Sequence, residues 1–251
     1  MGSGASVNSF VIAIDGPSGT GKSTVSRTLA RRLGAGYLDT GAMYRIVALA
    51  MLRAGIDVDD RTAVADHLSL VQFNSRTDPD SQRHDLNGQD VTAEIRGPAV
   101  TVAVTPVSAN PAVREWLRER QQTLAHSGRM VVEGRDIGTV IAPDAAVRVY
   151  LTADVAERAR RRHAQDDAVL VPDAGPVPGV AAGRETFRRP GSGADLDAVR
   201  ADLQRRDTVD STRATAPLRV ADGAVRIDTS TMTVQQVVDH LVRLAAERGI
   251  R

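Results

Sequence analysis

The sequence contains no cysteine, and only one of its 32 basic residues is a lysine. Without cysteine the chain cannot form a disulfide, a thiolate nucleophile or a cysteine-based zinc site. It also has no run close to the ~18 to 20 apolar residues that a membrane span needs. The first apolar run, Phe10 to Ile14, is too short for the core of a signal peptide. We therefore expect a cytoplasmic protein.

An excess of charge of one sign is absent as well, because 32 basic residues face 31 acidic ones and leave a formal charge of +1. No global field then draws the chain to nucleic acid or to an anionic membrane, although a local basic site is still possible. With 251 residues, 42% of them hydrophobic, the chain can bury a full core. We expect one α/β domain with a small insertion.

Short apolar runs alternate with helical patterns along the chain. Helices are predicted after Lys22, after Asn110 and over Val234 to Leu244, where apolar residues recur on one face. Five runs have the length and the flanking turn residues of buried parallel strands. They are Phe10–Asp15, Gly36–Asp39, Arg129–Gly134, Val147–Leu151 and Val225–Thr229. The alternation predicts a doubly wound α/β fold built on one five-stranded parallel sheet.

Two regions interrupt this alternation. Residues 59–98 contain short apolar pieces and the hairpin signal Asn87-Gly88, so we predict a small antiparallel insert there. Residues 169–195 are rich in Gly, Pro and Ala and are typical of a mobile loop or lid extension. Residues 9–251 would then form a single domain, with the insert at 59–98 and a lid with its extension at 154–195.

Gly16 to Ser23 fits the pattern GxxxxGK[ST], between a predicted strand and a predicted helix. Glycines allow the backbone N–H groups to surround phosphate oxygens, and the helix N-terminus adds partial positive charge. Ser23 would ligate Mg²⁺, and Lys22 would place a compact ammonium where a planar guanidinium is too wide. The alternative is a glycine turn that merely caps a helix. The context around the motif favours a nucleotide-binding loop.

Charged residues follow two of the predicted strands. In "YLDTGAMYR", Asp39 or Thr40 can cap a helix, but capping does not explain Arg45 one turn further on. In "VVEGRDIGTV", Glu133, Arg135 and Asp136 stand at the carboxyl edge of a buried strand, where α/β folds bind ligands. Three charges at such an edge are costly unless they are used. This edge is therefore a candidate acceptor site.

Two arginine-rich stretches follow later in the chain. "DVAERARRRH" holds Arg158, Arg160, Arg161 and Arg162, which indicate either a solvated helix face or a lid that clamps phosphates. "RRDTVDSTR" places Arg206, Asp210 and Arg213 on one helical stripe. That stripe is compatible with a ligand site and equally with an ordinary surface ladder of salt bridges.

Seven stretches in this order resemble the bacterial cytidylate kinase family over nearly the whole chain. They are "GPSGTGKST", "LDTGAMYR", "LNGQDVTAEIR", "VREWLRERQ", "EGRDIGTV", "RRDTVDSTRATAPL" and "IDTSTMTVQQVV". The resemblance implies a P-loop kinase fold with a five-stranded parallel core, an acceptor-binding insert and an arginine-rich lid. It also implies helix over Val100 to Val104, whose β-branched residues by themselves favour a strand.

The resemblance further implies a reaction and a site. The γ-phosphoryl group of ATP is transferred, with Mg²⁺ present, to CMP and also dCMP, giving CDP or dCDP and ADP in pyrimidine nucleotide metabolism. ATP would bind to Gly16, Pro17, Ser18, Gly19, Thr20, Gly21, Lys22, Ser23 and Thr24. The acceptor phosphate would meet Arg45, Arg135 and Arg213, the cytosine Thr105, Arg114 and Asp136, and the ribose Thr40, Arg206 and Asp210. Phosphoryl transfer would rely on Lys22, Arg45, Arg135, Arg158 and Arg162.

Two rival functions remain at this stage. One is a kinase for another small acceptor, such as UMP, dCMP or a non-nucleotide alcohol. The other is a nucleotide-dependent switch that hydrolyses slowly and signals through a partner. The switch is disfavoured because the guanine-reading sequence Asn-Lys-x-Asp requires a lysine, and the only lysine is already in the glycine loop. We expect a monomer that uses small-molecule substrates and binds neither nucleic acid nor a membrane.

Overall fold

The central sheet of the computed structural model has five parallel strands. The structure describes residues 9–168, 196–213 and 215–251. The strand order is β2-β6-β1-β7-β8, and the strands are Phe10–Asp15 (β1), Gly36–Asp39 (β2), Arg129–Gly134 (β6), Val147–Thr152 (β7) and Val225–Asp228 (β8). The five predicted strands are confirmed, with β7 one residue longer and β8 one residue shorter than expected. In the parallel register Asp39 lies opposite Glu133, and Asp15 lies opposite Gly134, so charged residues gather at one edge.

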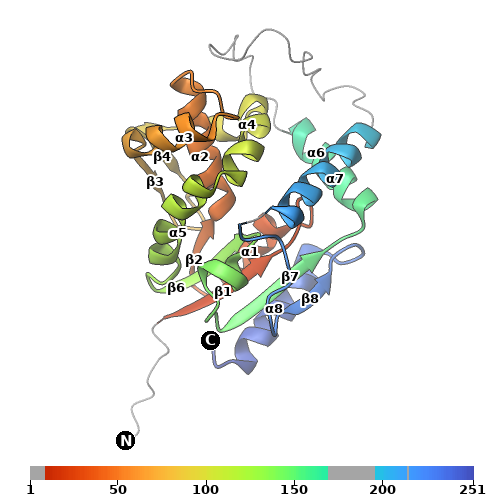
Figure 1. The fold of residues 1–251 in the computed structure, drawn as a ribbon. Helices are drawn as coiled ribbons and strands as arrows, with labels where there is room; N and C mark the ends of the chain where they lie inside the picture. Colours follow the sequence, from red (N-terminus) through yellow and green to blue (C-terminus); the bar gives the residue numbers. More distant parts are fainter. Residues whose placement is uncertain (1–8, 169–195, 214) are drawn as a thin grey trace, which may run out of the picture.

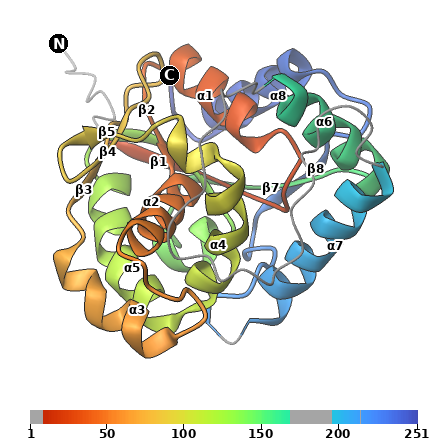
Figure 2. The same cartoon turned by 90° about the horizontal axis from the view of Figure 1, so that it is seen from above.

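Helices cover both faces of this sheet (Figure 2). Val11 and Ala13 of β1 pack on one side with α2 (Thr40–Arg53), α4 (Pro98–Ala109) and α5 (Pro111–Ala125). Ile12 and Ile14 pack on the other side with α1 (Lys22–Arg32) and α8 (Val234–Glu247). Because side chains alternate along a strand, a strand covered on both faces must be apolar at every position. All six residues of β1 are buried.

A small antiparallel unit follows α2, as the sequence predicts. It begins with α3 (Arg61–His67) and the short helix η1 (Leu68–Leu70), and its strands are β3 (Phe73–Ser75), β4 (His84–Leu86) and β5 (Gln89–Asp90). Asn87 and Gly88 join the last two strands with φ angles of 51° and 79°, which suits a tight hairpin. The short helix η2 (Glu94–Arg96) then leads into α4.

This small unit is fastened to strand β2 and to helices α1 and α2. The backbone N–H of Tyr37 on the edge strand β2 donates a hydrogen bond to the Thr77 carbonyl at 2.7 Å. Arg31 of α1 forms an ion pair with Asp80 at 2.6 Å, and Arg53 of α2 pairs with Glu94. The loop between β3 and β4 thereby covers an edge that would otherwise expose unpaired backbone groups.

The segment around Val100 to Val104 is helical, as the family resemblance implied. Gly97 and Pro98 begin α4, and proline at the first helical position is favourable because its missing N–H would have no helical partner. Asn110 then caps α5 by accepting a hydrogen bond from the Ala112 N–H at 3.0 Å. Burial of Val100 and Val107 against the core outweighs the local preference of β-branched residues for strands.

Two antiparallel helices lie across from the insert and α4, over the same end of the sheet (Figure 1). They are α6 (Val155–Ala168) and α7 (Leu196–Thr212), and the short helix η3 (Ile137–Ile141) connects β6 to β7. The predicted lid begins on α6, but its Gly/Pro-rich part, 169–195, lies outside the described residues. Within the described part of the chain, no helix has the length and apolar character to cross a membrane.

Candidate active site

The glycine loop turns from the end of β1 into α1, as predicted. Gly16 has a φ angle of 142°, and a Cβ atom there would lie 2.2 Å from the Leu151 carbonyl oxygen of β7. A Cβ at Gly19 would lie 2.9 Å from the Arg158 Cβ on α6. Only glycine fits such close approaches and positive φ angles. The loop is therefore packed tightly between β7 and α6.

Lys22 opens α1 and is buried with 7% of its surface exposed. Its ammonium donates a hydrogen bond to the Pro17 carbonyl at 2.7 Å, so the side chain folds back over the loop. Burial, and then the nearby charge of Arg135, lower the pKa of Lys22 to about 7. A phosphate would favour the charged form and would replace the backbone carbonyl as its partner.

Ser23, at the start of α1, lies close enough to the Glu133 carboxylate at the end of β6 to stabilise its charged form. Glu133 is 3% exposed, and its backbone carbonyl accepts a hydrogen bond from the Thr40 hydroxyl at 2.7 Å. Burial raises the pKa of Glu133, as does the nearby charge of Asp39. The sequence placed Glu133 at this edge but gave it no role.

Asp15 connects the glycine loop to the turn after β6. Its two carboxylate oxygens accept hydrogen bonds from the Ile137 and Gly138 N–H groups, both at 2.8 Å. Burial raises the pKa of Asp15 to about 6, although these two hydrogen bonds oppose the shift. The contact fixes the segment that carries Arg135 and Asp136. Sequence reasoning missed Asp15, because it was counted only as the last strand residue.

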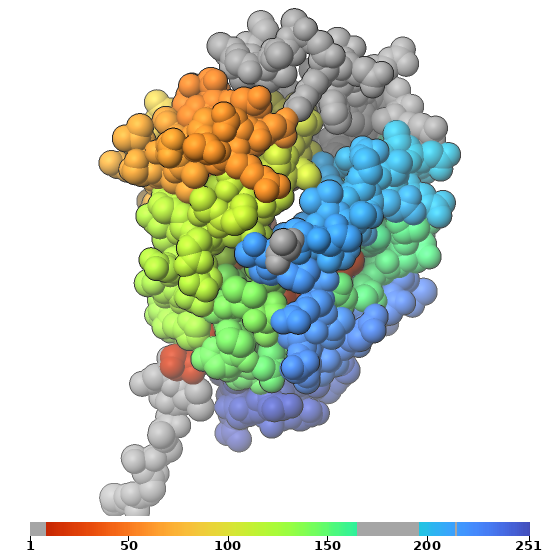
Figure 3. All heavy atoms as spheres, in the orientation of Figure 1, coloured from red at the N-terminus to blue at the C-terminus, as the bar shows by residue number. Residues whose placement is uncertain are grey.

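A cavity of about 120 Å³ opens at this edge between α4, α5 and α7. Figure 3 shows the cleft between the yellow-green atoms of α4 and α5 and the blue atoms of α7. All the predicted acceptor-binding residues except Arg45 line the cavity. The full lining is Thr40, Gly41, Tyr44, Val104, Thr105, Ser108, Arg114, Arg135, Asp136, Arg206, Asp210 and Arg213. Tyr44 and Ser108 were not anticipated.

Several of these residues neutralise one another inside the cavity. Arg114 forms a buried ion pair with Asp136, and each side chain is at most 6% exposed. Asp210 accepts hydrogen bonds from Arg135 at 2.8 Å and from Arg213 at 3.3 Å. Asp210 is 15% exposed and Arg213 is 7% exposed, so this part of the α7 stripe is not a solvated surface ladder. An anionic acceptor can compete with Asp210 for the two arginines.

Arg45 lies within electrostatic reach of three other arginines. Arg45 donates to the Ile95 carbonyl and to the Thr101 hydroxyl, both at 3.0 Å. Its pKa is lowered to about 9 by burial and then by three neighbouring cations, Arg96, Arg162 and Arg206. Like charges held together in a partly buried place favour an anion between them. The predicted Arg45, Arg162 and Arg206 are therefore close together.

Arg96 is the member of this group that the sequence did not single out. It lies on η2 and donates a hydrogen bond to Asp39 Oδ2 at 2.6 Å, while Asp39 Oδ1 caps α2. Asp39 is the main cause that raises the pKa of Arg96. The sequence "AEIR" contained the residue, but no pattern in it indicated that the side chain pairs with Asp39.

The arginines of α6 differ in their surroundings. Arg158 is buried, and it donates to the Ser18 carbonyl at 3.1 Å and pairs with Asp207 of α7 at 2.7 Å. Arg161 donates to the carbonyl of Thr229 at 2.7 Å, and the Thr229 hydroxyl in turn donates to the Thr20 carbonyl. Arg160 is largely exposed and pairs with Glu157. Arg158 and Arg161 thus connect the lid helix to the glycine loop.

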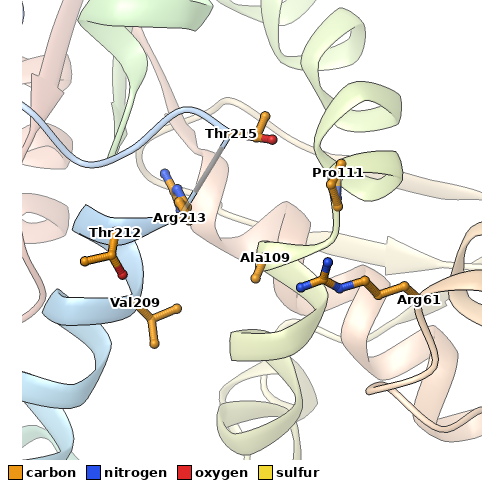
Figure 4. A pocket seen from close by; sticks show the side chains of 7 residues that line it. All are labelled: Arg61, Ala109, Pro111, Val209, Thr212, Arg213 and Thr215. Carbon is orange, nitrogen blue, oxygen red and sulfur yellow. The ribbon is translucent and has the colours of Figure 1, made fainter.

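A second cavity, of about 220 Å³, adjoins the acceptor cavity at Arg213. Figure 4 shows it between the end of α7 and the junction of α4 with α5. It is lined by Arg61, Ala109, Pro111, Val209, Thr212, Arg213 and Thr215. Arg213 is the one residue common to the two linings.

Comparison with known proteins identifies the family. The family model for cytidylate kinase matches residues 12–171 and 181–247. A cytidylate kinase from Rhodococcus opacus is 52% identical, over 97% of this chain and 98% of its own length. Those from Rhodococcus jostii and Mycolicibacterium paratuberculosis are 50% and 51% identical, over 97% and 95% of this chain and 97% and 96% of their own lengths. The resemblance in the sequence is thus confirmed, and the chain belongs to the cytidylate kinase family.

Proposed function

We infer that this chain transfers the γ-phosphoryl group of ATP to CMP, and also to dCMP, giving the diphosphate and ADP. The observation that carries the proposal is that the glycine loop and the acceptor cavity lie at the same edge of the sheet. The glycine loop ends β1, and the acceptor cavity begins at the turn after the neighbouring strand β6. The turn is tied to the end of β1 through Asp15. The proposed kinase domain is 9–251, with the acceptor-side insert at 59–98 and the lid at 154–195.

The chemistry requires positioning and charge neutralisation more than proton transfer. The attacking oxygen of CMP is already anionic near neutral pH, so a general base has little to do. Lys22 would leave the Pro17 carbonyl for the transferring phosphoryl group. Arg45, Arg135, Arg158 and Arg162 would neutralise the negative charge of donor and acceptor. The Arg135–Asp210 pair would open when the acceptor phosphate binds.

Recognition of the acceptor would divide along the cavity. Arg114 and Asp136 form one buried pair, which can present a donor and an acceptor to the edge of cytosine. Thr105 lines the wall on the same side. Asp210, Arg206 and Thr40 would meet the ribose, and Arg213 would join Arg45 and Arg135 at the phosphate. All these groups come from one chain, which suits the expected monomer, and the expected substrates are small molecules rather than nucleic acid or a membrane.

A magnesium ion fits the loop. Mg²⁺ prefers oxygen ligands and retains water and phosphate oxygens in its shell. Ser23 would hold the ion, and the buried Glu133 carboxylate, which lies close to Ser23, would face it. When bound, the ion would supply positive charge that neutralises the phosphate oxygens during transfer. The protein groups around that position are Lys22, Ser23 and Glu133.

An acceptor panel tests the proposed reaction. Release of ADP would be measured with ATP and, in turn, CMP, dCMP, UMP and AMP at equal concentrations. We expect the highest kcat/KM for CMP, a lower value for dCMP and much lower values for UMP and AMP. A higher kcat/KM for UMP or AMP than for CMP would contradict the proposal. ADP release without any acceptor would indicate a hydrolase instead.

A further inference from the structure

Tyr37 of β2 contacts Glu133 of the neighbouring strand β6. The two side chains lie diagonally on the same face of the sheet, because Asp39 lies opposite Glu133 and Tyr37 lies opposite Val131. The Tyr37 hydroxyl donates a hydrogen bond to Glu133 Oε1. Tyr37 is 1% exposed and Glu133 is 3% exposed. A phenol and a carboxylate are therefore paired inside the protein, next to the glycine loop.

The carboxylate is shared between this phenol and the loop. Ser23 and Lys22 both lie close enough to Glu133 to interact with its charge. The Glu133 backbone is fixed as well, because its carbonyl accepts from the Thr40 hydroxyl at 2.7 Å. Rotation of the carboxyl group is the freedom that remains, and the Tyr37 hydroxyl restricts it.

Tyr37 itself is held from three directions. Its backbone N–H donates to the Thr77 carbonyl at 2.7 Å, and its carbonyl accepts from the Gln82 side chain at 3.3 Å. The Arg27 guanidinium lies 5.6 Å from the centre of the ring. The hydroxyl is thus a donor at a fixed point. Groups outside the immediate ligands of an ion commonly orient those ligands and tune the site in this way.

We propose that Tyr37 is a positioning residue for the magnesium–nucleotide site: its hydroxyl fixes one oxygen of Glu133, so that the carboxylate keeps its orientation toward Ser23 and the ion. This inference rests on the magnesium site proposed above. Tyr37 acts through Glu133 and needs no contact with nucleotide. Loss of the hydroxyl then weakens the contribution of Mg²⁺ to nucleotide binding and leaves nucleotide binding without Mg²⁺ unchanged.

Calorimetric titration with ADP, once in Mg²⁺ and once in EDTA, measures this contribution directly. For wild type, the ratio of the two affinities gives the gain from Mg²⁺. Tyr37→Phe keeps the ring and removes only the hydroxyl. We expect the gain to fall about tenfold, the lower end of the range for groups that orient metal ligands. The affinity for ADP in EDTA should stay within twofold of wild type, which also reports that the variant is folded.

Two further variants separate positioning from general stabilisation. Ser75→Ala is the matched control, because the Ser75 hydroxyl is also buried and lies 3.1 Å from His84 Nδ1, in the insert. Its removal should lower the melting temperature without changing the gain from Mg²⁺. In a Glu133→Gln background, Tyr37→Phe should cause little further loss of the gain, because the residue acts through Glu133.

The outcomes are distinct. An unchanged gain from Mg²⁺ in Tyr37→Phe, whether or not its melting temperature falls, overturns the positioning role and leaves the magnesium site in place. An equal additional loss in the Glu133→Gln background also overturns it. If wild-type protein shows no gain from Mg²⁺, both the magnesium site and the role of Tyr37 are wrong, while the phosphoryl transfer to CMP is judged separately by the acceptor panel.

Discussion

Lys22 shows at the scale of one residue why the chain keeps a lysine where arginine is otherwise its only strong cation. Its ammonium reaches the Pro17 carbonyl from within a tight loop, and a guanidinium is too wide and planar for the same place. We expect Lys22→Arg to lower kcat about 10²- to 10³-fold, as for loss of one group that stabilises the transition state. The melting temperature should change little. Steady-state kinetics and thermal melts check this, and activity within a few-fold of wild type would contradict it.

Asp136 should decide between cytosine and uracil. If its carboxylate accepts a hydrogen bond from the exocyclic amine of cytosine, Asp136→Ala removes an interaction that UMP never makes. The variant should therefore lose much more kcat/KM with CMP than with UMP. Both values will fall somewhat, because Arg114 loses its buried partner. The ratio of the two kcat/KM values is the measurement, and equal losses would make Asp136 a structural residue.

At the scale of elements, helix α7 contributes Asp210 to a contact with the turn after β6. An exposed ladder pair is worth roughly 0.3 to 0.5 kcal/mol, but this carboxylate bridges Arg135 and Arg213. We expect Asp210→Ala to lower kcat/KM for CMP about ten- to a hundredfold, as for lost hydrogen bonds to a charged group. The loss should be smaller for dCMP, which lacks the 2′-hydroxyl. Changes within twofold for both substrates would exclude a ribose contact.

The stability of the same variant has a separate expected outcome. Removal of Asp210 leaves two partly buried arginines without their shared partner, so the melting temperature should fall. Removal of one member of an exposed ion pair would change the melting temperature little. Asp202→Ala on the same helix is the control. Asp202 pairs with Arg205 and Arg206, and its side chain is 35% exposed. Its melting temperature should change less than that of Asp210→Ala.

The insert contributes Arg96 to the group of arginines around Arg45. We expect Arg96→Ala to raise the KM for CMP about tenfold at low ionic strength, and less at high salt, where screening weakens the attraction of the cluster for an anion. Arg83→Ala is the control, because Arg83 belongs to the same insert but pairs with Asp85 and Asp90 on an exposed surface. An equal rise in KM for both variants would contradict a role for Arg96 in the cleft.

Most of the elements, but few of their contacts, could be predicted from the sequence. The strands were visible because burial on both faces imposes continuous apolar runs, as in Phe10–Asp15. Helix α4 needed the family resemblance, since Val100 to Val104 favours a strand by local preference. The sequence could not predict the ion pair between Arg31 and Asp80, which fastens the insert to α1. The two residues are 49 positions apart, and nothing in the pattern distinguishes them from other surface charges.

At the scale of the whole molecule, Asp15 couples the stability of the fold to pH. Its folded pKa is about 6, against an ordinary value of 3.8. Between these values the folded state binds more protons than the unfolded state, so this carboxyl makes stability fall as pH rises from about 4 to about 6. The full effect is on the order of 2 to 3 kcal/mol. The contribution becomes constant only about one unit above the folded pKa, where Asp15 is ionised in both states.

Asp15→Asn isolates this contribution from those of other groups. Asparagine has nearly the same shape as aspartate and does not titrate, so a pH-dependent difference between the two proteins comes from Asp15. Urea unfolding of both proteins at pH 4.5, 5.5 and 6.5 gives the difference in free energy of unfolding. The free energy of unfolding of wild type minus that of Asp15→Asn should fall as pH rises. A difference that is constant with pH would show that Asp15 keeps an ordinary pKa in the folded protein.

The sequence predicted which residues line the candidate site, but it did not predict the ion pairs that these residues form with one another. The family resemblance predicted that Arg135, Asp210 and Arg213 bind the substrate. The sequence could not indicate that they hold one another, since Arg135 and Asp210 are 75 positions apart. The missed residues Asp15, Tyr37 and Arg96 act through contacts between distant elements, and so does Glu133, which the sequence located but gave no role. Their roles depend on the orientation of side chains, which spacing along one strand or loop does not determine.

The single lysine also makes the protein selectively addressable by chemistry. Reagents that acylate amines find one side-chain target in the whole chain, and that target lies in the glycine loop. The 31 arginines elsewhere are inert to such reagents, so modification beyond the α-amino group reports only on Lys22. A nucleotide bound to the loop would shield it. The extent of acylation, read by mass, thus measures occupancy of the donor site without any label having to be introduced.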